Sequence, residues 1–307
     1  MSQPFRILCA VDFSKPAQAA FKQALALSRA RNAELTVVHA VPKDQPFRSN
    51  AHKRIAMLAA LRQAAAEAGI RLKVSVQHGN PAGVILLHAR ARHPDLIVIG
   101  THQRTGLERL RSGSVAETIT LRAACPVLAV PAPADGSVAT PTSSFESVLC
   151  PVDFSAVSST ALRHTLSLAT ASKSRVTLVH VVPGMSRTNV YHSVSPYRVP
   201  EYRDLVTHEA WRRLQEAVPP GERRSGRVLV RVVTGDPSTE ITRIAADVNA
   251  DVIVMGVTSR NAVGRRLFGA TATRVMRTAG CAVLAVPALR RGGVGFPTEE
   301  RALDGAA

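Results

Sequence analysis

The sequence of 307 residues is poor in aromatic side chains, which make up 4% of it and include one tryptophan and three tyrosines. Aliphatic residues and alanine must therefore form the core, because hydrophobic residues still reach 46% of the chain. No apolar run approaches the roughly 20 residues that a membrane helix needs. The segment Met1–Arg6 also lacks a basic region that leads into a cleavable apolar stretch. We therefore expect a globular, cytoplasmic protein with no membrane partner.

Cysteine is scarce as well, and its positions argue against disulfide or metal chemistry. The four residues Cys9, Cys125, Cys150 and Cys281 show no CxxC spacing of the kind found in zinc and redox sites. A free cysteine packs like a small hydrophobic residue, so we interpret all four as buried core positions. No spacing of histidines indicates a metal site.

Acidic residues are also in deficit, with 22 Asp and Glu against 39 Lys and Arg, which gives a net charge of +17. Nucleic acid, an anionic membrane and nucleotide phosphates are all compatible with such a field. A basic solvated surface is the interpretation that we favour, which leaves nucleic acid as the less favoured partner. One polar loop contains Arg104, Arg109 and Arg111. Two interpretations are open for these arginines: they contact phosphate groups, or they face solvent.

Patterns for efficient catalysis are missing too. The sequence contains no Gly-Lys-Ser/Thr phosphate loop, no legible nucleophile with a base and an orienting partner, and no paired carboxylates. We therefore predict no catalytic residues and expect that the chain is not an enzyme.

What the sequence does contain is an internal repeat. Cys9–Ser14 (Cys-Ala-Val-Asp-Phe-Ser) returns as Cys150–Ser155 (Cys-Pro-Val-Asp-Phe-Ser), at an offset of 141 residues. Further along, Gly100 matches Gly256 at an offset of 156, so one insertion of 15 residues within Gly184–Arg203 separates the copies. A period of this size is a whole domain with its own core. We predict domains over 1–132 and 145–289, a flexible linker over 133–144, a disordered tail over 290–307, and a long surface loop at the insertion.

Each copy alternates β-branched apolar runs with alanine-rich helical stretches, which is typical of β-α-β units. Strands that are almost wholly apolar indicate a parallel sheet covered on both faces. We therefore predict an α/β fold of two tandem doubly wound domains, each a five-stranded parallel sheet with helices on both faces. Asn80-Pro81 and Asp236-Pro237 predict helix starts. The predicted strands are 5–11, 34–41, 71–77, 95–99 and 126–130, then 147–152, 175–182, 227–233, 251–255 and 282–286.

Ligands bind such sheets at the carboxyl ends of the strands, where the winding reverses. Strand orders 2-1-3 and 3-2-1-4-5 are both compatible with the pattern, and we adopt 3-2-1-4-5. Asp12 ends the first strand and Gly100 ends the fourth, so both would face one crevice. A helix that opens at Gly113-Ser114 would direct free N–H groups and its positive dipole end there, which suits an anion.

These residues resemble the universal stress protein family. The similarity rests on Gly100–Gly106 (Gly-Thr-His-Gln-Arg-Thr-Gly), Gly113-Ser114, Pro126–Val130, Asp12–Ser14 and the second-strand His39, and both copies resemble the family over nearly their full length. In nucleotide-binding members a glycine loop ending in Ser or Thr binds ATP phosphates, with Mg²⁺ accompanying the ATP. The Asp after the first strand contacts ribose, and the backbone after the second-strand His receives adenine.

The resemblance implies an ATP-binding stress-response sensor or interaction module, with at most slow hydrolysis of bound ATP. Asp12 would meet ribose and the Ala40 backbone would meet adenine. Gln103 and Ser259 replace the second glycine of the two loops, and Ala270 replaces the hydroxyl residue. These departures favour an alternative, a scaffold that binds no nucleotide and acts through contacts with an unknown protein partner. The implied nucleotide-binding positions are Asp12, Ala40, Gly100, Gln103, Gly113, Ser114 and Val115 in the first copy, and Asp153, Val181, Gly256 and Gly269 in the second.

The fifth strand of each copy is short, apolar and expected at a sheet edge, where unpaired backbone groups seek a partner. In the family this edge makes dimers. We predict that Pro126–Val130 and Ala282–Val286 pair antiparallel, which gives an intrachain pseudo-dimer with an internal pseudo-twofold axis, and that two chains can assemble further as a homodimer. We interpret His39 and His180 as packed, hydrogen-bonded core histidines.

Overall fold

The computed structural model describes residues 4–44, 50–101, 114–132, 141–184, 199–258 and 270–288. The strands are β1 (Arg6–Ala10), β2 (Glu34–Val41), β3 (Leu72–His78), β4 (Leu96–Thr101), β5 (Val127–Pro131), β6 (Ser147–Pro151), β7 (Arg175–Pro183), β8 (Val228–Gly235), β9 (Val252–Val257) and β10 (Ala282–Pro287). The helices are α1 (Lys15–Arg31), α2 (Ala51–Glu67), α3 (Pro81–Arg92), α4 (Ser114–Arg122), α5 (Ala156–Ser172), α7 (Val199–Ala217), α8 (Pro220–Arg224), α9 (Pro237–Asp247) and α10 (Ala270–Thr278).

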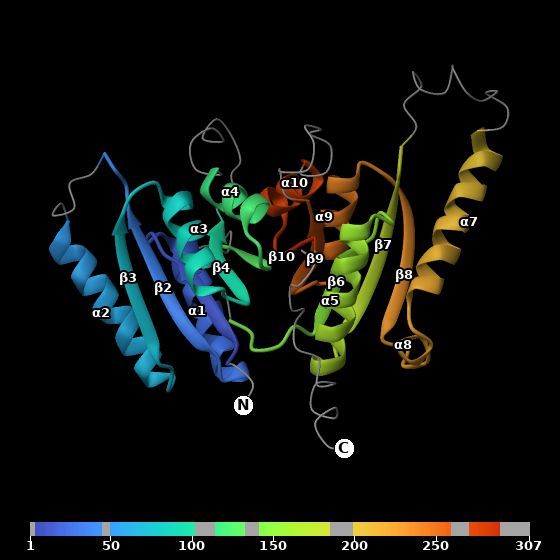
Figure 1. The fold of residues 1–307 in the computed structure, drawn as a ribbon. Coiled ribbons are helices and arrows are strands. Elements are labelled where there is room, and N and C mark those ends of the chain that lie inside the picture. Colours follow the sequence, from blue (N-terminus) through green and yellow to red (C-terminus); the bar gives the residue numbers. More distant parts are fainter. Residues whose placement is uncertain are drawn as a thin grey trace.

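In the described ranges the strands form one ten-stranded sheet in the order β3-β2-β1-β4-β5-β10-β9-β6-β7-β8 (Figure 1). Each half therefore has the predicted order 3-2-1-4-5, counted inward from its outer edge. The pairings within each half are parallel. The predicted α/β fold with two doubly wound halves is confirmed, and the strand ends differ from the prediction by only one or two residues.

The two halves join through the antiparallel pair β5 and β10, as predicted. Leu128 lies opposite Leu284, and Val127 lies opposite Ala285. Leu128 and Leu284 are equivalent positions at the repeat offset of 156 residues. Exchanging the two halves therefore maps this pair onto itself, which places a local pseudo-twofold axis at the centre of the sheet.

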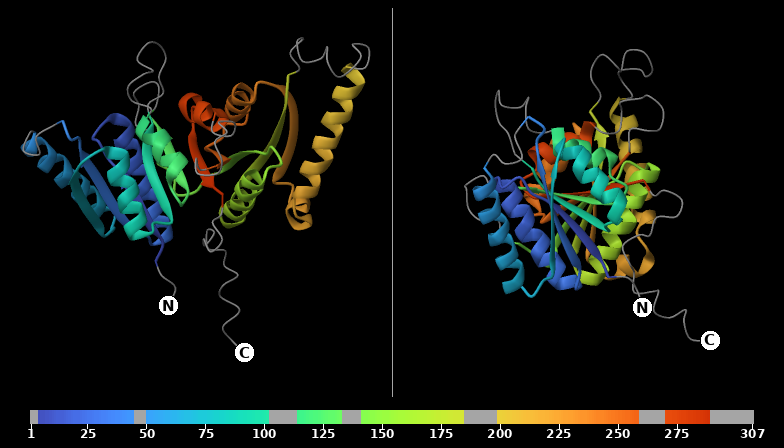
Figure 2. Two further views of the ribbon diagram at one scale, coloured as in Figure 1. Left: turned by 45° about the horizontal axis from the view of Figure 1, so that its top comes forward. Right: turned by 60° about the vertical axis from the view of Figure 1, so that its left-hand side comes forward.

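Helices cover both faces of the sheet (Figure 2). Because successive strand residues point to opposite faces, Ile7 and Cys9 pack on one side and Leu8 on the other. The first core layer lies under α1, α2, α5 and α7, and the second lies under α3, α4, α9 and α10. Each layer contains residues of both halves.

The cysteines belong to this core, though unequally. Cys9 and Cys150 are fully buried, while Cys125 and Cys281 are partly buried against the second core layer. Burial raises the pKa of all four thiols to about 12. The thiolate form is therefore scarce at neutral pH, and these side chains act as packing groups.

The prediction of a long loop over the whole insertion is wrong at its end. Residues 199–203 belong to helix α7, which continues to Ala217 and packs against the first core layer through Leu214; residues 185–198 lie outside the described ranges. Part of the predicted linker is also held in place, since Gln23 Nε2 on α1 donates to the Thr142 carbonyl at 2.7 Å and Thr142 N donates to Gln23 Oε1 at 3.1 Å. Residues 133–140 and 289–307 are not among those described, and the domain boundaries stay a prediction.

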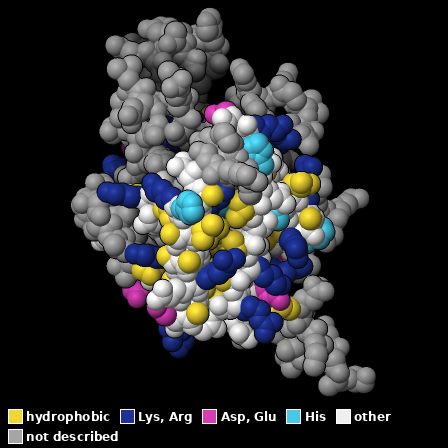
Figure 3. All heavy atoms as spheres, turned by 90° about the vertical axis from the view of Figure 1, so that its left-hand side faces the viewer, with side chains coloured by type: hydrophobic (Ala, Val, Ile, Leu, Met, Phe, Trp, Pro, Cys, Tyr) yellow, Lys and Arg dark blue, Asp and Glu magenta, His cyan; other side chains and the backbone are white. Residues whose placement is uncertain are grey.

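The excess positive charge is visible on the surface. On the end of the first half that carries α2 and β3, Lys and Arg side chains outnumber Asp and Glu and surround a few apolar groups (Figure 3). Within the described segments, no helix is both long and apolar enough to cross a bilayer.

Two glycines allow strands to approach helix starts. A Cβ added to Gly100 in β4 would lie 2.4 Å from the carbonyl carbon of Pro16, and one added to Gly256 in β9 would lie 2.4 Å from the carbonyl oxygen of Val157. Both contacts are with backbone, which cannot swing aside as a side chain can. Gly100 and Gly256 are thus packing requirements in addition to any part they take in a site.

We predict that Gly100→Ala lowers the free energy of unfolding by about 1–3 kcal/mol, because the added methyl overlaps the first turn of α1. Gly280→Ala is the matched control, since a Cβ there meets nothing within 4 Å, and it should change stability by less than about 0.5 kcal/mol. Urea denaturation of both variants measures the difference. Equal midpoints for the two would contradict the proposed overlap.

Candidate functional site

A pocket of about 710 Å³ lies at the carboxyl ends of β1, β2 and β4 in the first half. This is the predicted position, between β1 and β4, where the winding of the sheet reverses. Helices α2, α3 and α4 of the first half and α10 of the second half also contribute residues to its walls. The apolar lining includes Val41, Met57, Ile85, Ile99 and Ile119.

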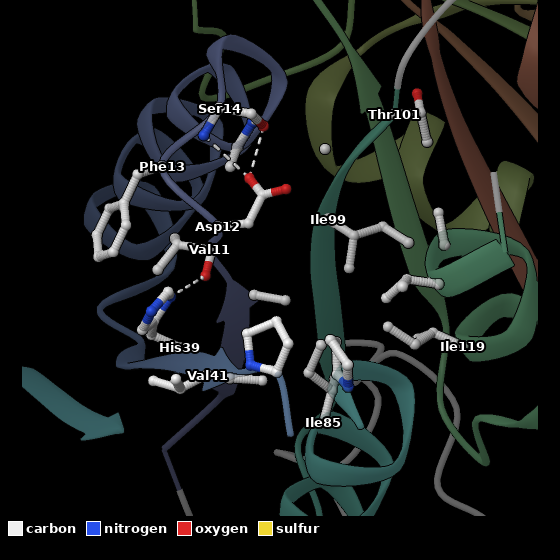
Figure 4. A pocket seen from close by; sticks show the side chains of 18 of the residues that line it. Val11, Asp12, Phe13, Ser14, His39, Val41, Ile85, Ile99, Thr101 and Ile119 are labelled. Carbon is white, nitrogen blue, oxygen red and sulfur yellow. Dashed lines mark hydrogen bonds between the residues drawn. The ribbon is translucent and has the colours of Figure 1, made fainter. Parts of the chain in front are cut away.

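A strained turn presents Asp12 to the pocket. Phe13 has φ of 64°, which is an uncommon conformation for a bulky residue. The Asp12 carboxylate holds the turn by accepting hydrogen bonds from Ser14 N at 3.0 Å and Ser14 Oγ at 2.5 Å. Ser14 in turn caps α1 by accepting from Ala17 N. The Asp12 side chain points into the space between β1 and β4 (Figure 4).

His39 lies beneath this turn. Its Nδ1–H donates to the Val11 carbonyl at 2.8 Å, and its ring lies 4.5 Å from that of Phe13. Burial lowers the pKa of His39, the positive charge of Arg54 lowers it further, and the backbone hydrogen bond only partly opposes them. The ring is therefore neutral at neutral pH, and it is the packed, hydrogen-bonded core histidine that the sequence predicts. His180 repeats the arrangement with the Val152 carbonyl at 2.7 Å.

The backbone of Ala40 faces the pocket for a reason of strand geometry. Val11 N donates to the Val38 carbonyl, so Val38 directs its backbone groups toward β1. Backbone direction alternates along a strand, so Ala40 directs its N–H and C=O to the same side, beyond the last paired residue of β1. Ala40 lines the pocket, and among the described residues these two backbone groups have no partner in the β1–β2 ladder. In the second half, Val152 N donates to the Val179 carbonyl. By the same alternation, Val181 directs its backbone N–H and C=O to the same side as Val179.

Charged side chains enter the pocket from both halves. Lys53 and Arg54 come from α2, Glu117 comes from α4, and Arg277 comes from α10 of the second half. Arg277 Nη2 donates to Glu117 Oε2 at 2.7 Å. The sequence alone does not show that these cations approach the pocket, because only the β5–β10 pairing brings α10 to it and only the fold brings α2 there.

The model of the universal stress protein family matches residues 5–131 and again residues 144–287. The chain belongs to the universal stress protein family. Universal stress protein G of Shigella flexneri is 30% identical over 145 residues, which cover 46% of this chain and 99% of that protein. A universal stress protein of Methanocaldococcus jannaschii is 42% identical over 73 residues, 24% of this chain and 43% of the relative, so this match spans less than half of the relative's length. The crystal structure of a universal stress protein from Archaeoglobus fulgidus has a TM-score of 0.66 at 18% identity and covers 93% of this chain and 99% of that one. That likeness shows the same fold.

In this tandem universal stress protein, four of the expected positions meet in the first-domain pocket, namely Asp12, Ala40, Gly100 and Val115. Ser114 is the first residue of α4. Gln103, Gly113 and Gly269 lie outside the described ranges. In the second domain, Asp153 follows β6, Val181 is in β7 and Gly256 is in β9. The part that any of these residues takes in binding stays a prediction.

The second domain of this universal stress protein repeats the turn but not the surroundings. Phe154 has φ of 61°, and Ser155 N donates to Asp153 Oδ1 at 3.0 Å. The guanidinium of Arg213 lies over the Phe154 ring at 4.0 Å. Arg213 corresponds to Met57, which lines the first pocket, at the repeat offset of 156 residues.

A second difference lies between α9 and α10. Arg274 and Asp236 form an ion pair at 3.5 Å, whereas the equivalent residues of the first domain are the uncharged Thr118 and Asn80. The second domain therefore places charged side chains where the first has uncharged ones.

We predict that the free energy of unfolding decreases as the pH is lowered through the titration of His39. Its pKa is below the ordinary value of 6.5 in the folded protein, so the unfolded chain takes up the proton first as the pH drops. The contribution is full above pH 6.5 and declines below it. His39→Asn should make the decline shallower, as measured by urea midpoints at pH 7.5, 6.5 and 5.5. Parallel declines in the wild type and the variant would contradict the assignment.

Proposed function

We propose that the first domain binds an adenine nucleotide, with ATP as the preferred ligand, and that the protein acts as a nucleotide-dependent stress-response sensor or interaction module. The observation that carries the proposal is that the Asp12 carboxylate and Ala40, whose backbone N–H and C=O have no ladder partner among the described residues, line one pocket. A carboxylate accepts from ribose hydroxyls, and a free N–H and C=O pair suits the edge of a purine.

The walls of the pocket suit the remaining parts of such a ligand. Small-molecule sites commonly enclose about 300–1,000 Å³ and are mostly apolar with a few directed polar groups, and the volume of about 710 Å³ lies in that range. The isoleucines Ile85, Ile99 and Ile119 and the flexible Met57 offer apolar surface for a planar base. The pocket therefore combines an apolar slot with a polar rim.

Phosphate groups would lie toward α4. The first turn of this helix has N–H groups without an intrahelical partner and carries the positive end of the helix dipole, and Val115, Ala116 and Glu117 of that turn line the pocket. Lys53 and Arg54 add positive charge from the opposite side. Mg²⁺ would enter with ATP, held mainly by the phosphates and water.

The first domain is the better candidate of the two. The second domain has Arg213, the counterpart of the pocket residue Met57, over the ring of Phe154. A ligand there would have to displace the charged Arg213 side chain from its contact with that ring. We therefore assign the nucleotide to the first domain.

Isothermal titration calorimetry with Mg-ATP tests the proposal. Asp12→Ala should weaken binding at least about tenfold, because it removes an ionised hydrogen-bond acceptor. The matched control Asp153→Ala removes the equivalent carboxylate of the second domain and should leave the affinity within about twofold of the wild-type value. A larger loss in Asp153→Ala than in Asp12→Ala would reverse the assignment of domains.

Mass spectrometry of freshly purified, denatured protein adds a second measurement, because a tightly bound nucleotide is released on unfolding. Detection of ATP, ADP or AMP supports the proposal. If no nucleotide is released and Mg-ATP neither gives a binding heat nor raises the melting temperature, the scaffold hypothesis replaces it.

A further inference from the structure

One wall of the first-domain pocket belongs to the other domain. Thr273, Met276 and Arg277 of α10 line it together with α4. The contact between the two helices is specific, since Thr120 Oγ1 on α4 donates to Met276 Sδ at 3.5 Å and Arg277 binds Glu117. The β5–β10 pairing fixes this arrangement, because each of these helices precedes one of the two paired strands.

Arg277 has hydrogen-bonding capacity left over. A guanidinium carries five N–H donors, and within the described part of the chain the Arg277 side chain makes one bond, from Nη2 to Glu117. The side chain is 52% exposed and borders the pocket. Its Nε and Nη1 groups are therefore available to an anion that enters from the pocket side.

Glu117 explains why a cation is needed at this place. It lies in the first turn of α4, where a carboxylate interacts favourably with the helix dipole. The same negative charge would repel a phosphate approaching the N–H groups of that turn. Arg277 offsets this charge, and its planar fork suits phosphate oxygens.

We propose that Arg277 of the second domain contacts the phosphate groups of the nucleotide bound in the first domain, so that the site is complete only when the two domains are paired. This inference rests on the proposed function. It makes the second domain a contributor to the first site.

Arg277→Ala in the full-length protein tests the contact. Calorimetry should show Mg-ATP binding about tenfold weaker, whereas adenosine, which lacks phosphates and is measured by competition against ATP, should bind within about twofold of its wild-type affinity. The matched control is Arg243→Ala on α9, because Arg243 is also 52% exposed and also ion-paired with a glutamate, Glu240 at 2.8 Å, yet does not line the pocket. Arg243→Ala should leave both affinities unchanged.

The variant Glu117→Gln distinguishes a direct contact between Arg277 and phosphate from an indirect effect of Arg277 on the position of α4. If Arg277 acted only by holding α4 through the ion pair, breaking the pair from the other side would weaken ATP binding by the same factor as Arg277→Ala. The proposed contact predicts the opposite, because the variant frees Arg277 and removes a repulsive charge, so ATP should bind at least as tightly as to the wild type. Equal losses in the two variants, or equal losses for ATP and adenosine in Arg277→Ala, overturn the proposal.

The two proposals fail in distinguishable ways. If the wild-type protein binds no adenine nucleotide, both proposals are contradicted. Wild-type protein that binds Mg-ATP through Asp12, but in which Arg277→Ala behaves like Arg243→Ala, keeps the nucleotide site and removes only the part assigned to the second domain.

Discussion

The antiparallel backbone pairing of β5 with β10 is the interaction on which the rest of the architecture depends. It merges two five-stranded sheets into one, and it lets the two core layers continue from one domain into the other. It also places α4 beside α10, which makes possible the Arg277–Glu117 ion pair. The pocket of the first domain thus takes its shape from a contact between residues more than 150 positions apart in the sequence.

Most of the fold could be predicted from the sequence, because its determinants are local or periodic. Apolar runs gave strands to within one or two residues, and Asn80-Pro81 and Asp236-Pro237 mark helix starts that the structure confirms, with both side chains capping. The convergence of Asp12 and Gly100 followed from a general rule about where parallel sheets reverse their winding. The antiparallel central pair followed from the edge position of two short apolar strands together with the family resemblance.

The parts that could not be predicted depend on tertiary contacts. Lys53, Arg54 and Arg277 reach the pocket from helices whose sequences show only ordinary basic residues. The sequence indicates Gly100 as a binding position, but it does not show that a side chain there would overlap the first turn of α1. The insertion was expected to be loop throughout, because the sequence pattern does not show where α7 begins.

The two domains illustrate how a duplicated fold can keep its core while its surfaces diverge. The strained turn, the hydrogen-bonded histidine and the capping serine recur in both copies with nearly equal geometry. Outside the core the two copies differ at isolated positions, where the pocket residue Met57 is matched by Arg213 and the α3 cap Asn80 is matched by Asp236. Core residues are constrained by close packing, whereas rim residues are free to change charge.

The covalent link between the halves has a consequence for the site that they share. In a dimer of separate chains, a composite pocket would be lost when the dimer dissociates on dilution. Here both walls belong to one polypeptide, so their effective concentration is fixed. Binding of the proposed nucleotide should therefore depend on the nucleotide concentration and require no association between separate chains.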